Sequence, residues 1–310
     1  MSTTIRDHAE DYLAMRRALG FKLTAFGQKL LSFVDYLEAH DASTLTTDAA
    51  LAWAMATPNS TDEVYWGRRL MVVRVFARHL AVHDPATEVP SAELLSRHYR
   101  RVTPHLYTPG EIAALMTAAD GLAPDLRAVT YRTLIGLLAT TGMRTGEACG
   151  LDRADVDLDA AIVTIHDSKF GKHRQVAVHA STVTALRHYG DVRDQLSVTV
   201  TTPAWFVSTR GTRLDKTNIP ATFARLVDIA GIETPTGQRR PRLHDFRHSF
   251  CTATLLEWYR DGVDVHARLP WLSTYLGHAD PKSTYWYLTG TTELLTLVAA
   301  RLEHAFGDQP

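Results

Sequence analysis

The sequence predicts a mainly α-helical protein with one small antiparallel β-sheet (α+β), arranged as two domains. Three observations support this fold class. Apolar residues recur at helical spacing from the amino terminus to about residue 90. A proline-punctuated segment then separates this region from a fresh helix start at Thr108. In the second region, two short β-branched runs flank a polar turn, which is typical of a hairpin.

Composition limits the class of protein. A chain of 310 residues can form one or two domains with real cores, and 45% hydrophobic and 22% charged residues are typical of globular proteins. The net charge of −1 argues against wholesale polyanion binding but allows a locally basic groove. Cys149 and Cys251 stand alone, which excludes a disulfide scaffold and a Cys-based zinc site. No signal peptide or bilayer-spanning stretch is recognisable, so we expect a cytoplasmic protein.

The first region reads as helices throughout. Helical spacing runs from Tyr12 to Leu19 and from Phe26 to Leu37, and Thr47-Asp48 opens a short helix. Thr61-Asp62 opens another, which extends to about Val82. This last helix has two interpretations, a solvated face or a stripe that contacts a DNA backbone, because it carries four arginines: Arg68, Arg69, Arg74 and Arg78.

The boundary between the regions is marked by Pro85, Pro90 and Pro104. Thr108 and Glu111 then form a capping-box pattern at the start of a new helix. We therefore predict a helical domain over residues 1–95, a linker over 96–106 and a second domain over 107–310. The linker carries a basic cluster of Arg97, Arg100 and Arg101.

The second region begins with predicted helices over 110–119 and 125–139, broken by Thr141-Gly142, and a short helix begins around Met143. Strand-like runs over 161–165 and 175–178 flank a basic turn. The pattern is helical again from about 214, interrupted by a loop that contains Arg239 and Arg240. An amphipathic tail helix is predicted over 291–306.

The segment from Arg242 to Tyr287 concentrates cationic and titratable residues. His244 and Arg247 are three residues apart and share a helix face. Gly277 is placed to end a helix, which leaves His278 just beyond it, and Tyr287 follows near the end of the next helix. These groups, delivered from three helix edges, predict a site for an anionic group.

Three segments occur in order: Thr141-Gly142-Met143-Arg144-x-Gly-Glu147, then His244-x-x-Arg247, then Leu276-Gly277-His278 with Tyr287 nine residues later. Together they closely resemble the tyrosine recombinases, or phage-type integrases, and most of all their transposon- or plasmid-borne members. The resemblance implies a SAM-like DNA-clamping domain over 1–95 and a catalytic domain over 107–310. It also implies that duplex DNA is cleaved and rejoined through a 3′-phosphotyrosine and a Holliday junction, without metal or cofactor.

The resemblance assigns a role to each matching residue. Arg144 and Arg247 would hold the non-bridging oxygens of one DNA phosphate. His244 and His278 would complete that clamp and assist proton movement, and Tyr287 would be the nucleophile. Lys169 would protonate the leaving 5′-oxygen, with Lys172 as the alternative. Glu147 is interpreted as support for an arginine, and Tyr285 is the alternative nucleophile.

Other interpretations remain open at this point. Taken singly, Arg144 and Glu147 could be a surface pair, His278 a structural residue and Tyr287 a core aromatic. Alternative functions are a type IB topoisomerase-like or dimer-resolving strand transferase, and a non-catalytic DNA-binding relative. The tail could fold onto its own core or dock on a neighbouring protomer of a tetramer.

The expected partners are double-stranded DNA with specific sites, further copies of this chain and accessory recombination proteins, with no membrane, in a nucleoid-associated location. We expect DNA binding to depend strongly on salt because basic residues cluster. The expected DNA-binding residues are Arg68, Arg69, Arg74, Arg78, Arg97, Arg100, Arg101, Lys172, Arg174, Arg239 and Arg240.

Overall fold

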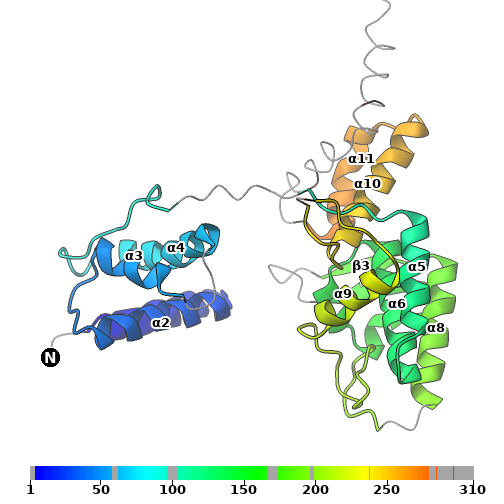
Figure 1. Cartoon of the computed structure of the whole chain (residues 1–310), viewed down its shortest axis with the longest axis horizontal. Helices are drawn as coiled ribbons and strands as arrows, with labels where there is room; N and C mark the ends of the chain where they lie inside the picture. The colour runs from blue at the N-terminus through cyan, green and yellow to red at the C-terminus, as the bar shows by residue number, and fades with distance from the viewer. Residues whose placement is uncertain are drawn as a thin grey trace, which may run out of the picture. The chain divides into compact units, whose positions relative to one another are not determined.

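The computed structural model describes residues 4–57, 62–95, 103–166, 173–195, 199–236 and 238–278, together with Thr284 and Thr296. Its contacts divide the chain into two compact units, Met1–Arg101 and Val102–Pro310 (Figure 1). Most described residues are helical, and a single three-stranded antiparallel sheet accompanies them, so the predicted fold class is confirmed. None of the described helices is long and apolar enough to cross a membrane.

The first unit packs four helices around its own core: α1 (Ile5–Ala18), α2 (Thr24–Ala39), α3 (Thr47–Met55) and α4 (Glu63–Leu80). Side chains that accept backbone N–H groups begin three of them, since Thr4, Thr46 and Asp62 are the N-caps of α1, α3 and α4. The core includes Phe33, which meets the ring of Trp53 edge-on at 5.2 Å.

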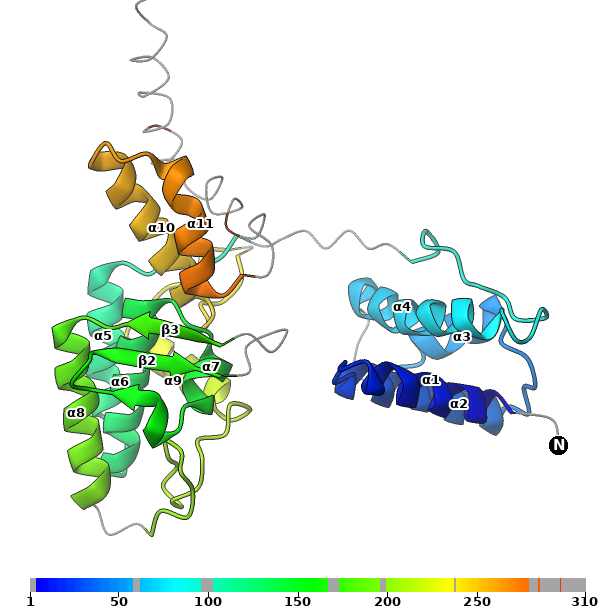
Figure 2. The same ribbon diagram turned by 180° about the vertical axis from the view of Figure 1, so that it is seen from behind.

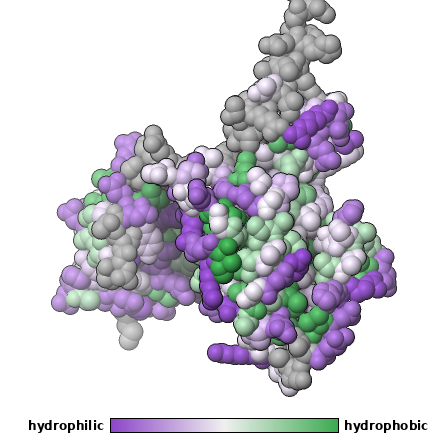
Figure 3. Space-filling model, turned by 45° about the vertical axis from the view of Figure 1, so that its right-hand side comes forward, coloured by the Kyte–Doolittle hydropathy of each residue, from purple (hydrophilic) through white to green (hydrophobic). Residues whose placement is uncertain are grey.

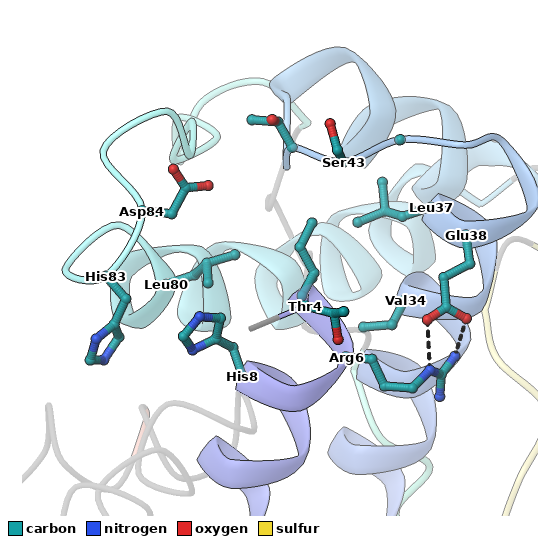
Figure 4. Close-up of a pocket in the computed structure, with 13 residues that line it drawn as sticks. Thr4, Arg6, His8, Val34, Leu37, Glu38, Ser43, Leu80, His83 and Asp84 are labelled. Atoms are coloured by element: carbon teal, nitrogen blue, oxygen red, sulfur yellow. Dashed lines mark hydrogen bonds and ion pairs between the residues drawn. The ribbon is translucent and has the colours of Figure 1, made fainter. Parts of the chain in front are cut away.

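An ion pair and a ring contact join the start of α1 to α2 and to the segment that follows α4. Arg6 donates from Nε and Nη2 to the two carboxylate oxygens of Glu38, at 2.7 and 2.6 Å (Figure 4). His8 stacks on His83 with ring centroids 5.3 Å apart. These residues line a hollow of about 840 Å³ in the first unit.

Arg74, which was predicted to contact DNA, is buried in the structure. Its side chain is 3% exposed and donates from Nε to the Pro90 carbonyl at 2.7 Å and from Nη2 to the Ser91 carbonyl at 2.5 Å. The helical repeat places position 74 on the buried face of α4, and the guanidinium satisfies carbonyls of the segment that returns along the unit. Arg74 therefore ties residues 90–91 to α4.

The second unit is built on α6 (Asp125–Thr141), which is buried along most of its length and contacts α5 (Pro109–Asp120), α8 (Ala180–Gln195) and α10 (Asp245–Arg260). The other helices are α7 (Thr145–Gly150), α9 (Ile219–Ile229), α11 (Val265–Leu276) and a 3₁₀ turn over Arg153–Asp155. On the face visible in Figure 3, hydrophilic and hydrophobic residues alternate over this unit.

The sheet has the order β1-β2-β3, with strands Val156–Asp157, Ile162–Ile165 and Arg174–Ala177. β2 and β3 form the predicted hairpin, in a register that pairs Val163 with Val176 and Ile165 with Arg174. β3 lies beside α11 (Figure 2). The hairpin turn, residues 167–172, lies outside the described residues.

α10 is fixed at its start by aromatic packing. Phe246 is fully buried and stacks on Tyr107 with ring centroids 4.3 Å apart. The Tyr107 N–H donates to the Ser249 hydroxyl at 2.8 Å, so the segment before α5 holds the first turn of α10. This turn carries His244 and Arg247, and its position decides where they lie.

Candidate active site

Parts of five elements meet at one place in the second unit, and most of them are far apart in the sequence. They are the carboxyl ends of α6 and α11, the start of α7, the first turn of α10 and the start of β3 (Figure 2). Three arginines, Arg144, Arg174 and Arg247, donate hydrogen bonds across these segments.

Arg247 is buried at the centre of this region, with 2% of its surface exposed. It donates from Nη1 to the Gly142 carbonyl at 3.0 Å and from Nη2 to the Leu276 carbonyl at 2.7 Å. Both acceptors lie at helix carboxyl ends, where the last carbonyls have no partner within the helix. Main-chain atoms of α6 and α11 therefore set the orientation of this guanidinium.

Arg144 occupies the N-cap position of α7 and keeps 30% of its side chain exposed. Nη1 donates to Glu147 Oε1 at 2.7 Å, and Nη2 donates to the Gly277 carbonyl at 3.3 Å. Its backbone N–H also donates to Glu147 Oε2 at 2.8 Å. The guanidinium is thus held in place while part of it faces solvent.

Glu147 joins two arginines. Arg174 donates to both of its carboxylate oxygens, at 3.1 and 2.7 Å, while Arg174 Nε donates to the Tyr275 carbonyl at 2.9 Å. Burial would raise the pKa of Glu147, but the hydrogen bonds from Arg174 and Arg144 lower it below its ordinary value. The carboxylate therefore stays ionised at neutral pH.

Arg174, which was predicted to contact DNA, has a buried side chain in the structure. Only 8% of its side chain is exposed, and it donates to Glu147 and to the Tyr275 carbonyl. The reason is the alternation of side chains along a strand. Arg174 is the first residue of β3, and it faces α7 and α11.

Two histidines complete the region. His244 precedes α10 and keeps part of its surface exposed to solvent. Partial loss of solvent around the ring, together with the adjacent Arg247, lowers its pKa. His278 follows α11, and burial together with Arg247 and Arg144 lowers its pKa to about 4. Both imidazoles are therefore neutral at pH 7, and the positive charge of the region comes from guanidiniums.

Thr284 is a site residue that the sequence did not indicate. Its hydroxyl lies 2.7 Å from His278 Nδ1, and its side chain is 1% exposed. This hydrogen bond orients the imidazole of His278 with Nδ1 towards the Thr284 hydroxyl. A threonine six residues after a histidine has no recognisable signature, so only the structure reveals it.

The remaining candidates divide into two groups. The first group lies outside the described residues and consists of Lys169, Lys172, Tyr285, Tyr287, Arg97, Arg100, Arg101 and, apart from Thr296, the tail over 291–306. Among described residues, Arg68 and Arg78 are exposed on α4. Arg69 is half-buried and donates from Nη2 to the Trp53 carbonyl at 2.7 Å, which restricts its reach.

A cleft of about 480 Å³ opens beside His244, with an apolar floor that includes Phe223 and Leu243. Its rim is basic and is formed by Lys216, Arg239, Arg240 and Arg242. Arg239 and Arg240 are exposed, and Arg240 also bonds Asp228 at 2.5 Å. Among the described residues, no cluster of three histidine, cysteine or acidic side chains is placed to hold a metal ion.

Comparison with known proteins identifies the family. A model described as the phage integrase family matches residues 106–293. The chain is 43% identical to the integrase/recombinase y4rB of Sinorhizobium fredii over 99% of both chains. It is 35% identical to y4rE of the same organism, over 95% of this chain and 94% of that protein.

Solved structures share the fold. The Tn1549 transposon integrase in complex with a circular intermediate DNA superposes with a TM-score of 0.67 at 16% identity, covering 98% of this chain and all of that chain. The XerH recombinase bound to its difH substrate in a post-cleavage complex gives 0.63 at 18% identity, covering 90% and 77%. The matched family model and the two long alignments show that this chain belongs to the phage integrase family, the tyrosine recombinases.

Proposed function

We propose that this chain is a site-specific recombinase in which Arg144, Arg247, His244 and His278 hold one phosphate of duplex DNA and Tyr287 attacks it. The product is a 3′-phosphotyrosine and a free 5′-hydroxyl, and exchange proceeds through a Holliday junction. The convergence of two guanidiniums and two imidazoles from three segments, the starts of α7 and α10 and the end of α11, is the observation that carries this proposal.

The chemistry requires fixed positive charge. Attack on a phosphodiester adds negative charge to its non-bridging oxygens, and guanidiniums that are already oriented stabilise this charge without reorganising. Arginine suits this task because it stays protonated and offers a fork of donors. Arg247 supports the proposal because main-chain carbonyls already orient it.

The nucleophile is the phenol of Tyr287, with Tyr285 as the alternative. The ordinary pKa of tyrosine is about 10, so attack at neutral pH needs a nearby cation or base. The two positions are about 200° apart on a helix, so only one can face the phosphate. The nine-residue spacing after His278 favours Tyr287.

The leaving 5′-oxygen needs a proton, which we assign to Lys169, with Lys172 as the alternative. The covalent protein–DNA bond conserves the energy of the phosphodiester, so rejoining needs no nucleotide cofactor. In this mechanism the guanidiniums carry out the charge stabilisation that a metal ion would otherwise supply. We therefore propose a metal-independent reaction.

The first unit and the tail have roles in assembly on DNA. We propose that residues 1–95 clamp duplex DNA, because α4 presents the exposed Arg68 and Arg78. The XerH and Tn1549 structures are complexes with DNA, which supports DNA as the partner. The expected assembly is a tetramer, in which the tail over 291–306 either folds onto its own core or docks on a neighbouring protomer. Truncation after Gly290 should abolish DNA-dependent assembly if the tail docks on a neighbour, and unaltered assembly would contradict that docking.

Covalent trapping tests the proposed function. Wild type, Tyr287→Phe and Tyr285→Phe would be incubated with nicked suicide duplexes cut from the ends of the encoding element, then denatured. We expect an adduct that only Tyr287→Phe removes. Loss only with Tyr285→Phe would move the nucleophile by two residues. Binding without any adduct would favour a DNA-binding relative that does not cleave. Relaxation of supercoils without strand exchange would favour the topoisomerase-like alternative.

A further inference from the structure

Arg174 lies where three site-bearing segments meet. It is the first residue of β3, which follows the lysine-containing turn of the hairpin in the sequence. Its guanidinium contacts Glu147 in α7, and Nε contacts the Tyr275 carbonyl near the end of α11. A single buried side chain therefore connects the hairpin, the Arg144 helix and the segment before His278.

The approach of Arg174 to α11 is close enough to constrain the sequence there. Gly277 has φ of +68°, and a Cβ on it would lie 2.6 Å from Arg174 Nη1, well inside van der Waals contact. Glycine at 277 thus serves the helix end and also leaves space for the guanidinium. The packing indicates that this position of Arg174 is built into the fold.

The charges of this group do not cancel. Arg144 and Arg174 both bond Glu147, so two positive charges share one negative charge. Arg174 takes both carboxylate oxygens, whereas the Arg144 side chain takes one. A net positive charge therefore remains, and the solvent-facing part of it lies on Arg144, since its side chain is 30% exposed and that of Arg174 is 8% exposed.

We infer that Arg174 is a positioning residue that shares Glu147, so that the carboxylate only partly compensates the charge of Arg144 and leaves it correctly oriented for the phosphate. Without Arg174, the buried carboxylate would pair with Arg144 alone and weaken its attraction for an anionic oxygen. The inference rests on the proposed function, because it assumes that Arg144 binds the scissile phosphate. It assigns Arg174 a charge-balancing role rather than a DNA contact.

The test measures single-turnover cleavage by Arg174→Ala, Glu147→Gln and the double variant on a suicide duplex. We expect Arg174→Ala to slow cleavage about 10- to 100-fold, less than or similar to loss of a direct oxyanion donor, with DNA affinity changed less than about threefold. The double variant should cleave about tenfold faster than Arg174→Ala, because no carboxylate remains to neutralise Arg144. A double variant that is no faster would overturn the inference.

A neutral substrate gives a second readout that a purely structural role would not change. A methylphosphonate at the scissile position develops less negative charge, so it depends less on the cationic clamp. We expect the Arg174→Ala defect to shrink to about threefold or less on this substrate. An equal defect on phosphate and methylphosphonate duplexes would contradict the charge-balancing role.

Controls separate the possible failures. Arg187→Ala removes an exposed arginine of α8 that pairs with Asp159, and it should leave cleavage unchanged. Arg174→Lys keeps the charge but loses the two-point contact with Glu147, so we expect a cleavage rate between those of wild type and Arg174→Ala. This variant also tests the inference if Arg174→Ala does not fold. If wild type forms no adduct, the proposed function fails and the inference falls with it. If wild type cleaves and Arg174→Ala cleaves equally well, only the inference fails.

Discussion

Arg144 and Arg247 share a proposed role but lie in different environments, and this difference can be measured. Arg247 is 2% exposed and satisfies two carbonyls, whereas the Arg144 side chain is 30% exposed. We expect Arg247→Ala to lower the free energy of unfolding by about 2–4 kcal/mol, because buried carbonyls lose their donors. Arg144→Ala should cost less than about 1.5 kcal/mol. Denaturant unfolding checks this, and equal losses would contradict the structure.

His278 should make the stability of the free protein depend on pH. Its pKa is lowered to about 4 in the folded chain, against about 6.5 when unfolded. The unfolded chain therefore binds the proton first, and stability present above pH 6.5 is lost as the pH falls towards 4. His278→Gln should flatten this part of the profile, whereas His266→Gln, an exposed residue of α11, should not.

DNA binding should reverse this shift. A phosphate beside His278 favours the protonated imidazole, so binding between pH 5 and 6 should take up a proton that His278→Gln does not take up. Calorimetry in buffers of different ionisation enthalpy measures this uptake. Equal uptake by both proteins would place the titrating group elsewhere.

The sequence predicts which side chains form the site better than it predicts the hydrogen-bond partners that orient them. Motif spacing is enough to expect Arg144, His244, Arg247 and His278 in one site, and these four do lie together. The partners of Arg247 are main-chain carbonyls, which every residue carries, so no residue pattern can reveal them. The same limit applies to Arg174, because one of its partners is the main-chain carbonyl of Tyr275.

At the scale of elements, two glycines with similar left-handed backbones allow a controlled comparison, because their surroundings differ. Gly277 and Gly262 have φ of +68° and +72°, but a Cβ on Gly262 would meet nothing within 4 Å. Gly262→Ala should therefore cost only the backbone strain, about 1–2 kcal/mol. Gly277→Ala should cost more and slow cleavage at least tenfold, because it displaces Arg174. Equal thermal shifts for both variants would show that the guanidinium moves aside freely.

Elements with strong local signals were predictable from the sequence. The capping box of Thr108 and Glu111 forms at the start of α5, and Gly142 and Gly277 end α6 and α11. β1 was missed because its two residues depend on pairing with β2. α8 was also missed, since its buried positions include the polar Thr182 and Arg193, which weakens the apolar pattern.

At the scale of the molecule, each unit has a separate core, so effects on DNA binding and on stability can be assigned within one unit. Arg78 is exposed on α4 and Arg74 is buried one turn away. We expect Arg78→Gln to reduce the slope of log affinity against log salt by about 1. Arg74→Met should leave that slope unchanged and lower stability by about 1–3 kcal/mol.

The measurement is DNA affinity across a salt series, with denaturant unfolding of each variant alongside. Wild type should show a steep dependence on salt despite its net charge of −1. A flat dependence would contradict the basic DNA-binding surface. A reduced slope for Arg74→Met with normal stability would show that this side chain leaves its buried position.

The three arginines of the site are anchored to carbonyls of residues 142, 275, 276 and 277. A carbonyl oxygen is present whatever side chain its residue carries. Proteins that evolve from this chain can therefore replace Tyr275 or Leu276 by residues of similar size and keep the same hydrogen bonds to the arginines. Substitutions at these positions should be limited by the backbone conformation that they must keep. The hydrogen-bond acceptors of the three arginines can therefore remain when the side chains at these positions change.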